Sequence, residues 1–203
     1  MTETQHFDRS AATWDLAERR VVLAHAVAEA IAARVPLSRE QSALDFGCGT
    51  GLVTLELAPR VGSITGADTS SGMLQALEAK AEAQGLPVGL LQLGAEETTD
   101  LGGPYDLIVS SMTLHHIADV PALFRQFAQH LRPGGRVALA DLDEEDGSFH
   151  DETMVVPHRG FPRERIRTWL ADAGFREIHL ETATVTRKEG RDYPIFLATA
   201  QKP

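Results

Sequence analysis

The chain has 203 residues, the length of one α/β domain, and 43% of them are hydrophobic, which is enough to fill a core. Its net charge of −10 disfavours nucleic acid and anionic membranes as partners, so we expect a small-molecule substrate. The single cysteine excludes an intramolecular disulfide, no apolar run reaches about 18 residues, and the polar N-terminus lacks a secretory pattern. We therefore expect a cytoplasmic monomer or homodimer.

The N-terminal part of the chain is rich in helix formers. Apolar residues, among them Leu16, Val22 and Leu23, recur at helical spacing from Ala11 to Val35. The pattern predicts an amphipathic helix, limited by Pro36 and packed on the edge of a sheet.

The stretch from Ser42 to Gly51 predicts a strand, a tight turn and the start of a helix. Gly47, Gly49 and Gly51 allow positive φ and let a ligand approach the main chain where a Cβ would collide. The pattern is G-x-G-x-G, whereas the dinucleotide fingerprint is G-x-G-x-x-G. Asp45 before the turn would sit badly beside a diphosphate and suits a cationic or amino-bearing ligand.

At these residues the chain resembles the class I S-adenosylmethionine-dependent methyltransferases of the small-molecule type. The resemblance runs from about Phe7 to the C-terminus. It implies S-adenosylmethionine as the cofactor, held by residues of the glycine turn: Asp45, Gly47, Cys48, Gly49 and Gly51. Cys48 is interpreted as a small filler of the turn rather than a reactive thiol.

The N-terminal segment carries a second part of the resemblance. Phe7, Asp8, Ala11, Trp14 and Asp15 follow the family spacing F-D-x-x-A-x-x-Y-D, with Trp in place of Tyr. In the family this segment covers the cofactor, so residues 1–36 are expected to form a helical cover in which Trp14 contacts it. The alternative is that Trp14 only anchors the helix on the sheet.

A second strand, Ser63 to Ala67, ends at Asp68, and a helix follows to about Gln84. An acid at the end of this strand is where a ribose diol would accept hydrogen bonds. The run from Asp68 to Met73 resembles the family's second motif, which implies that Asp68, Thr69 and Met73 hold the cofactor. Ser70 is also expected to cap the helix, and Met73 alternatively belongs to the core.

The third strand, Val88 to Leu93, precedes a loop that in the family holds adenine. Members commonly place an acid before an Ala-Glu pair, but this chain has Gly94 there. The resemblance still implies contacts from Ala95 and Glu96, and a solvated acidic loop is the alternative.

Tyr105 to Ser110 is continuously apolar enough to be a buried parallel strand. Leu114, His115 and His116 then follow, which resembles the family's L-H-H segment. Because ligands bind at the carboxyl ends of such strands, Ser110 should lie near the cofactor and the histidines near the methyl group. His116 is the preferred general base or acceptor-positioning residue, with His115 second; a structural role for both is the alternative.

A helix from Asp119 to Leu131 and a strand from Arg136 to Ala140 flank Arg132 to Gly135, a turn that resembles the family's L-x-P-G-G. Residues 141–161 lack periodicity, as is common in substrate loops. We expect His150 and His158 to contact the substrate. His150, Asp151 and His158 match no metal site of recognised spacing, so no metal is predicted.

The last elements are a helix from Pro162 to Ala173 and two strands, Arg176 to Thr182 and Tyr193 to Ala200. Alternating strands and helices predict a single doubly wound α/β domain spanning residues 1–203. The resemblance adds a seven-stranded Rossmann-like sheet of order 3-2-1-4-5-7-6, with strand 7 antiparallel.

The sequence therefore predicts methyl transfer from S-adenosylmethionine to a nucleophilic atom of a small molecule. One alternative is a non-catalytic module that binds S-adenosylmethionine as a sensor. Another, disfavoured by Asp45 and the glycine spacing, is an NAD-dependent oxidoreductase.

Overall fold

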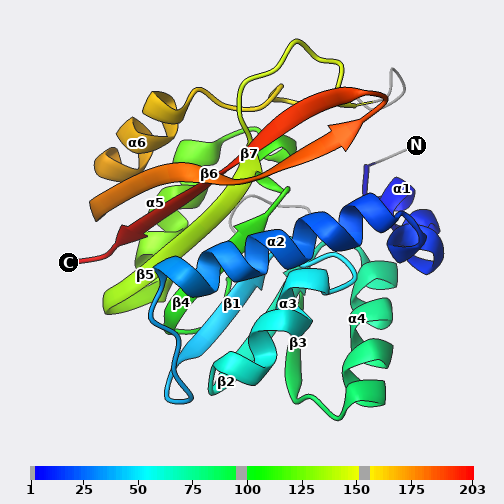
Figure 1. Ribbon diagram of the computed structural model, residues 1–203. Helices are drawn as coiled ribbons and strands as arrows, with labels where there is room; N and C mark the ends of the chain where they lie inside the picture. Colours follow the sequence, from blue (N-terminus) through cyan, green and yellow to red (C-terminus); the bar gives the residue numbers. More distant parts are fainter. Residues whose placement is uncertain (1–2, 95–99, 151–155) are drawn as a thin grey trace.

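The computed structural model describes residues 3–94, 100–150 and 156–203, and shows a twisted sheet with helices on both faces (Figure 1). The sheet within these ranges has seven strands in the order β3-β2-β1-β4-β5-β7-β6. They are β1 (Ser42–Phe46), β2 (Ser63–Asp68), β3 (Val88–Gln92), β4 (Tyr105–Ser111), β5 (Leu131–Leu142), β6 (Arg176–Lys188) and β7 (Arg191–Gln201). Neighbours from β3 to β5 run parallel, and β7 is antiparallel to β5 and β6. The predicted fold class and strand order are confirmed.

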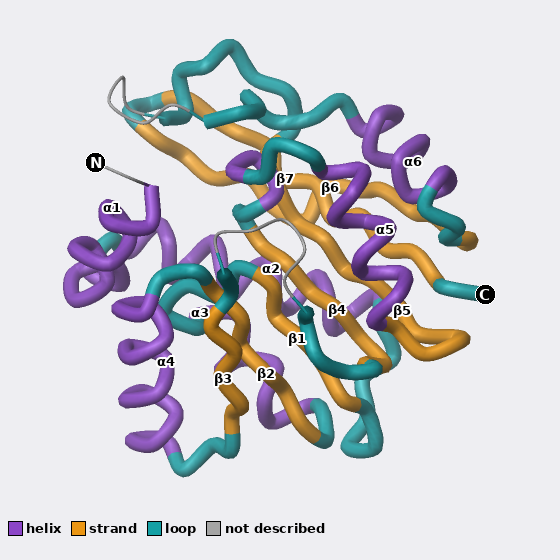
Figure 2. The backbone as a smooth tube through the Cα atoms, turned by 180° about the vertical axis from the view of Figure 1, so that it is seen from behind, coloured by secondary structure: helices purple, strands orange, loops and turns teal. Residues whose placement is uncertain are grey.

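The central strands are mainly apolar because both of their faces are buried. In β1 and β4, Leu44 and Ile108 belong to one core layer, whereas Ala43 and Leu107 belong to the layer on the opposite face. Figure 2 shows α5 and α6 over the first layer, with α2 and α3 behind the sheet. The helices are α1 (Glu3–Ser10), α2 (Glu18–Arg34), α3 (Leu52–Leu57), α4 (Ser71–Gln84), α5 (Val120–His130) and α6 (Arg163–Asp172), with short 3-10 turns η1 (Ala11–Leu16), η2 (Ala58–Arg60) and η3 (Leu114–His116).

The strand register brings the carboxyl ends of β1, β2 and β4 to one edge of the sheet. Asp45 in β1 pairs with Gly66 in β2 and with Val109 in β4. The turns that follow these three strands therefore meet above the same edge, where open α/β sheets bind their ligands.

The single helix predicted from Ala11 to Val35 is wrong at its start. The chain forms the turn η1, becomes extended at Ala17 (φ −79°, ψ 94°) and only then begins α2. Leu16 and Val22, predicted on the buried face, are 80% and 60% exposed. The side chain of Asp15 accepts hydrogen bonds from Thr50 and Lys80, and these long-range contacts take the place of a continuous helix.

The C-terminal strands are longer than the sequence predicts. β6 and β7 continue as a hairpin to a turn at Glu189 and Gly190, because Thr184, Thr186 and Lys188 pair with residues of β7. From its charged residues, the sequence predicts a turn around Arg187 to Gly190 and ends the first strand at Thr182. In an edge strand these side chains project into solvent, so charge does not exclude a strand.

No helix in the described ranges is long and apolar enough to cross a membrane.

Candidate active site

A cavity of about 860 Å³ lies at the carboxyl edge of the sheet. The turns after β1, β2 and β4 form its floor, and Phe7 and Trp14 from the N-terminal segment (residues 3–16) line it from the other side. His150, on the loop after β5, reaches it as well. The sequence elements predicted to meet at this edge are therefore brought together around one space.

The glycine turn is held in a shape that side chains would prevent. Gly47 has φ +71°, and a Cβ there would lie 2.2 Å from Cγ2 of Thr113. A Cβ on Gly51 (φ +82°) would lie 2.2 Å from a methyl carbon of Leu77. A Cβ on Gly49 (φ +54°) would have no neighbour within 4 Å. Gly47 and Gly51 thus allow close packing of the protein, whereas Gly49 borders open space.

Two carboxylates stand on either side of this turn. Asp45 is buried and accepts a hydrogen bond from the Thr54 hydroxyl at 2.6 Å. Burial, together with the charge of Asp68, raises the pKa of Asp45 to about 7. Asp68 accepts hydrogen bonds from the backbone N–H groups of Gly49 (2.8 Å) and Ser70 (2.9 Å), although burial still raises its pKa. A cation or a set of hydroxyl donors would stabilise both groups in their charged forms.

The other predicted residues of the first two motifs also lie at the cavity. Thr69, Met73 and Cys48 line it, and Met73 is only 1% exposed. Burial and the nearby charges of Asp45 and Asp68 raise the pKa of the Cys48 thiol well above its usual range. Cys48 is therefore a protonated, inert thiol that fills the turn.

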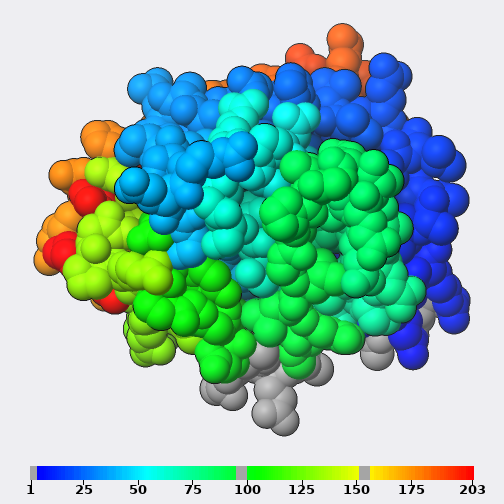
Figure 3. Space-filling view, turned by 90° about the horizontal axis from the view of Figure 1, so that it is seen from below, coloured from blue at the N-terminus to red at the C-terminus, as the bar shows by residue number. Residues whose placement is uncertain are grey.

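The N-terminal segment is tied to the domain by two aspartates. Asp8 accepts hydrogen bonds from the Ser70 hydroxyl (2.6 Å) and the Gly72 N–H (3.0 Å) at the start of α4. Asp15 accepts from the Thr50 hydroxyl and from Lys80, each at 2.6 Å. Figure 3 shows this segment, in dark blue, packed against α4, in green. The sequence spacing indicated these aspartates but not their partners.

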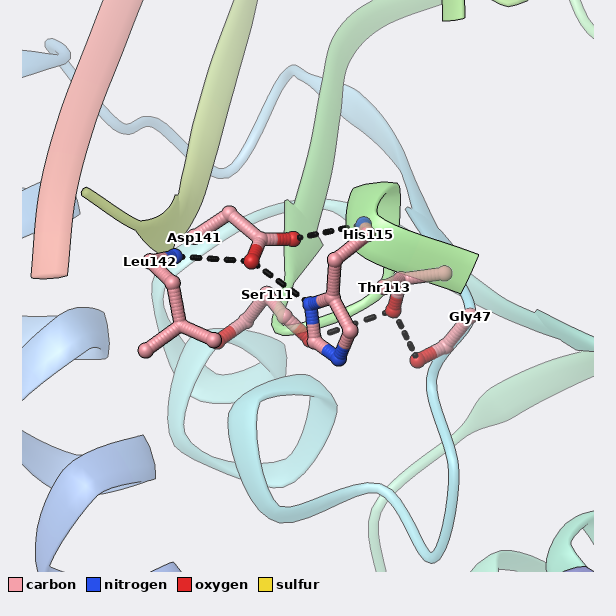
Figure 4. Close-up of polar contacts among 6 residues, drawn as sticks. All are labelled: Gly47, Ser111, Thr113, His115, Asp141 and Leu142. Atoms are coloured by element: carbon pink, nitrogen blue, oxygen red, sulfur yellow. Dashed lines mark hydrogen bonds and ion pairs between the residues drawn. The ribbon is translucent and has the colours of Figure 1, made fainter. Parts of the chain in front are cut away.

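Two adjacent histidines follow β4. His115 is 2% exposed, and its Nδ1–H donates to Oδ1 of Asp141 at 2.6 Å (Figure 4). The backbone N–H groups of His115 and Leu142 also donate to Asp141. Burial alone would raise the pKa of Asp141, but the charge and hydrogen bond of His115 hold it below its usual value. In the neutral form of the ring, this bond leaves Nε2 of His115 as the nitrogen with the lone pair.

His116 and His150 complete a cluster of imidazoles. The His116 ring meets the Phe7 ring edge-on, with centroids 5.4 Å apart, and so joins the N-terminal segment to the cavity. The His150 ring lies 4.8 Å from that of His115. Burial and the charges of the other two histidines lower the pKa of His150 to about 4, so it is neutral near pH 7. Lys188 donates to the carbonyl of Phe149 at 2.8 Å and fixes this part of the loop.

Some predicted site residues do not line the cavity. Ser110 is fully buried and its hydroxyl donates to the carbonyl of Phe46, so Ser111 lines the cavity in its place. Successive residues of a strand point to opposite faces, so Ser110 and Ser111 of β4 differ in direction. Gly51 caps α3 behind the turn and does not line the cavity.

His158, predicted to contact substrate, is also outside the cavity. Its ring packs against Phe161 and Trp169, and its backbone N–H donates to the carbonyl of His115. It therefore supports the histidine turn from behind. Ala95, Glu96 and Asp151 lie outside the described residues.

Sequence reasoning missed Asp141 as a site residue. It was grouped with the acidic loop, yet it stands at the carboxyl end of β5 as Asp45 and Asp68 stand at the ends of β1 and β2. The same positional signal would have found it. Lys188 had no such signal, because the predicted strand ended at Thr182 and Lys188 was expected in the turn of the hairpin.

This arrangement defines a Rossmann-like α/β protein with a ligand site at the carboxyl edge of its sheet. A family model described as a methyltransferase domain matches residues 16–180. Since the match covers most of the chain, the protein belongs to the methyltransferase domain family, as the sequence predicted.

Individual relatives agree with this assignment. A biotin biosynthesis bifunctional protein BioCD from Bordetella avium is 39% identical over 139 residues, which are 67% of this chain and 29% of that protein. A ubiquinone biosynthesis O-methyltransferase from Rhizobium etli is 33% identical over 127 residues, 63% of this chain and 48% of that protein. The chain thus spans less than half the length of either relative.

A solved structure supports the fold. An S-adenosylmethionine-dependent methyltransferase from Clostridium acetobutylicum superposes with a TM-score of 0.73 at 18% identity, covering 97% of this chain and 99% of that one. At this identity the likeness shows the fold alone.

Proposed function

We propose that this protein transfers a methyl group from S-adenosylmethionine to a nucleophilic oxygen, nitrogen, sulfur or carbon atom of a small molecule. The observation that carries the proposal is that one cavity joins the glycine turn, Asp45 and Asp68 to the histidines after β4. Membership of the methyltransferase domain family and the similarity to an O-methyltransferase of ubiquinone biosynthesis support it.

The residues present fit the cofactor. Asp68 has two carboxylate oxygens with about four acceptor sites, and two backbone N–H groups occupy only part of them, so hydroxyls of a ribose have acceptors. The open space beside Gly49 admits a ligand against the main chain. Asp45 favours a positive charge nearby, which the sulfonium and the amino group of S-adenosylmethionine carry. Trp14, Thr69 and Met73 would pack along it.

The cofactor, when bound, would supply a methyl group activated by the sulfonium charge, because the neutral thioether is a good leaving group. The protein must then hold the acceptor in line with that methyl group and exclude water, and positioning supplies most of the rate. His116 borders the cavity beside Phe7, and we assign it the role of general base or acceptor-positioning residue. A base at this point adds about 10²–10⁴ in rate.

Binding measurements test the cofactor assignment. Calorimetry should show binding of S-adenosylmethionine and S-adenosylhomocysteine and no binding of NAD. Micromolar NAD binding with neither sulfur compound bound would support the oxidoreductase instead. Release of S-adenosylhomocysteine with a panel of acceptors then distinguishes an enzyme from a sensor, because a sensor binds without turnover.

The histidine role is tested by substitution once an acceptor is known. His116→Ala should lower turnover and leave cofactor affinity nearly unchanged. His115→Ala should mainly lower stability, because its ring is buried against Asp141. Full turnover of His116→Ala across the pH range would show that positioning by other groups carries the catalysis.

The proposal also covers the class of acceptor, the domain organisation, the oligomeric state and the cellular compartment. The net charge of −10 supports a small-molecule acceptor over nucleic acid or an anionic membrane. A single domain over residues 1–203, acting as a monomer or homodimer in the cytoplasm, is what we expect; light scattering and localisation of a tagged protein test the last two points.

A further inference from the structure

Three histidines gather at the end of the cavity where the acceptor would bind. His115 and His116 come from the turn η3 after β4, and His150 comes from the loop after β5. One nitrogen of each ring can be chosen so that all three lie within 4.8 Å of one another. We propose that His115, His116 and His150 form a binding site for a divalent transition-metal ion, Zn²⁺ above all, with one coordination position open to the methyl acceptor.

The environment of His115 supports a metal ligand. Metal-binding histidines commonly donate their other ring N–H to a carboxylate, which fixes the tautomer and the ring orientation. Nδ1 of His115 makes this bond to the buried Asp141, and Asp141 is in turn held by the N–H of Leu142. Nε2 of His115 is therefore directed away from Asp141 with its lone pair available.

The distances require a small adjustment of the side chains. In a tetrahedral site with Zn–N bonds of about 2.0–2.1 Å, ligand nitrogens are about 3.4 Å apart. The present separations are up to 4.8 Å, and the proposal requires rotation of the rings to bring the nitrogens to this shorter distance. His115 is fixed by Asp141, so we expect His150, on the loop, to make most of the movement.

The donor set indicates which ion binds. Three imidazoles suit Zn²⁺, Co²⁺, Ni²⁺ or Cu²⁺, whereas Mg²⁺ and Ca²⁺ prefer oxygen ligands. Three protein ligands with a fourth position open is the pattern of catalytic zinc sites, and structural sites use four protein ligands. The cavity beside the three rings provides that open position.

A second group of candidate ligands serves as a comparison. His25, Glu29 and Glu56 also approach one another, but His25 and Glu29 are exposed. Glu56 is paired with His25, and Glu29 with Arg60. The carboxylate that bonds the His25 ring belongs to the partly exposed Glu56, and none of the three residues lines the cavity beside the histidine cluster. The group therefore provides a control for adventitious metal binding.

The consequence for chemistry rests on the proposed function, with His116 in its acceptor-positioning role, because a ring nitrogen bound to the ion cannot also act as a base. An acceptor hydroxyl or thiol that binds as the fourth ligand has a lowered pKa and releases its proton to solvent. Its oxygen or sulfur then forms the bond to the methyl carbon while the carbon–sulfur bond of the sulfonium breaks and the electron pair stays on sulfur. The site therefore favours acceptors with an ionisable O–H or S–H group.

Metal binding is tested on the whole chain without the cofactor. Protein treated with a chelator and then dialysed is titrated with Co²⁺, followed by its visible absorption, and with Zn²⁺ in competition with a chelating dye. We expect one equivalent of Co²⁺ to bind per chain, with the visible absorption of a four-coordinate site. Mg²⁺ should not displace the bound Co²⁺.

Three variants decide where the ion binds. Removing a residue that only hydrogen-bonds a metal ligand typically lowers metal affinity about tenfold to a hundredfold, so we expect a loss in this range for Asp141→Asn. His150→Ala removes a ligand itself and should weaken binding at least as much. His25→Ala should bind as the wild type does. Circular dichroism and thermal melting confirm folding, and His150, on a loop, is the variant least exposed to a folding defect.

The opposite results overturn the proposal. Unchanged affinity in His150→Ala, or a loss confined to His25→Ala, would place the ion elsewhere, and no binding of Zn²⁺ by folded wild type would exclude the site. Because these titrations contain no S-adenosylmethionine, they are independent of the calorimetry that tests the proposed function. Methyl transfer that survives complete removal of metal would leave catalysis to His116 as a base.

Discussion

The buried carboxylate of Asp45 makes stability depend on pH in an unusual direction. Burial raises its pKa from 3.8 to about 7, so between these values the folded chain holds a proton that the unfolded chain releases. A state that binds an extra proton becomes less stable, relative to one that does not, as the pH rises. The contribution of Asp45 to stability therefore falls from about pH 4 to about pH 7 and is constant above that.

The size of the effect follows from the shift. At 1.36 kcal/mol per pKa unit, the titration of Asp45 lowers the stability of the folded state, relative to its value below pH 3, by about 1.7 kcal/mol at pH 5 and about 4.3 kcal/mol at pH 8. Asp45→Asn removes this titration and retains an oxygen for the bond with Thr54. We expect the variant to gain about 2.5 kcal/mol relative to wild type between pH 5 and pH 8.

Urea unfolding of both proteins at several pH values measures this difference. Comparing the two proteins is essential, because other groups titrate in the same range: the lowered pKa of His150 makes stability fall as the pH decreases below about 6.5. Their effects cancel in the difference. If the difference in unfolding free energy between the two proteins does not change with pH, the pKa of Asp45 is not raised. The reasoning from burial would then fail.

The same group links stability to binding. A cationic ligand beside Asp45 favours its ionised form, so binding near pH 7 should release about half a proton from this residue. Calorimetry with S-adenosylmethionine in buffers of different ionisation enthalpy measures that release, and Asp45→Asn serves as the control that lacks it.

Four other substitutions test separate parts of the site. Asp68→Ala should weaken S-adenosylmethionine binding about tenfold to a hundredfold in calorimetry, because charge-assisted hydrogen bonds contribute roughly 1.5–3 kcal/mol; unchanged affinity would place the ribose elsewhere. Gly47→Ala should lower the free energy of unfolding by about 1–3 kcal/mol, because its Cβ would lie 2.2 Å from a threonine side chain. Gly49→Ala, with open space around its Cβ, should cost less, and equal losses would contradict the packing argument. Asp15→Ala should speed hydrogen exchange in the N-terminal segment, since two hydrogen bonds that hold it are lost; unchanged exchange would show that they do not.

The sequence by itself determined the fold and brought together the residues of the proposed cofactor end of the site. Asp45, the glycine turn and Asp68 are close along the chain or stand at strand ends, and parallel strands bring their carboxyl ends to one edge. Local pattern is therefore sufficient to place them. The mainly apolar composition of β1 and β4 likewise predicts burial on both faces, and this signal is contained within each single strand.

Tertiary structure decided the direction of side chains and the contacts between distant segments. Ser110 and Ser111 are equivalent in sequence, and only packing of the two layers decides that Ser110 turns to Phe46. The break after η1 depends on Asp15 reaching Thr50 and Lys80, contacts no local pattern contains.

The histidine cluster shows the same division most clearly. The sequence placed His115 and His116 near the methyl group but combined His150 with His158 and expected no metal. In the fold, the loop after β5 carries His150 to the first two histidines while His158 packs behind them against Phe161. The grouping that underlies the proposed metal site is decided by the path of this loop and by Asp141 at its start, because spacing along a chain does not determine distances across a loop that is free of periodic structure.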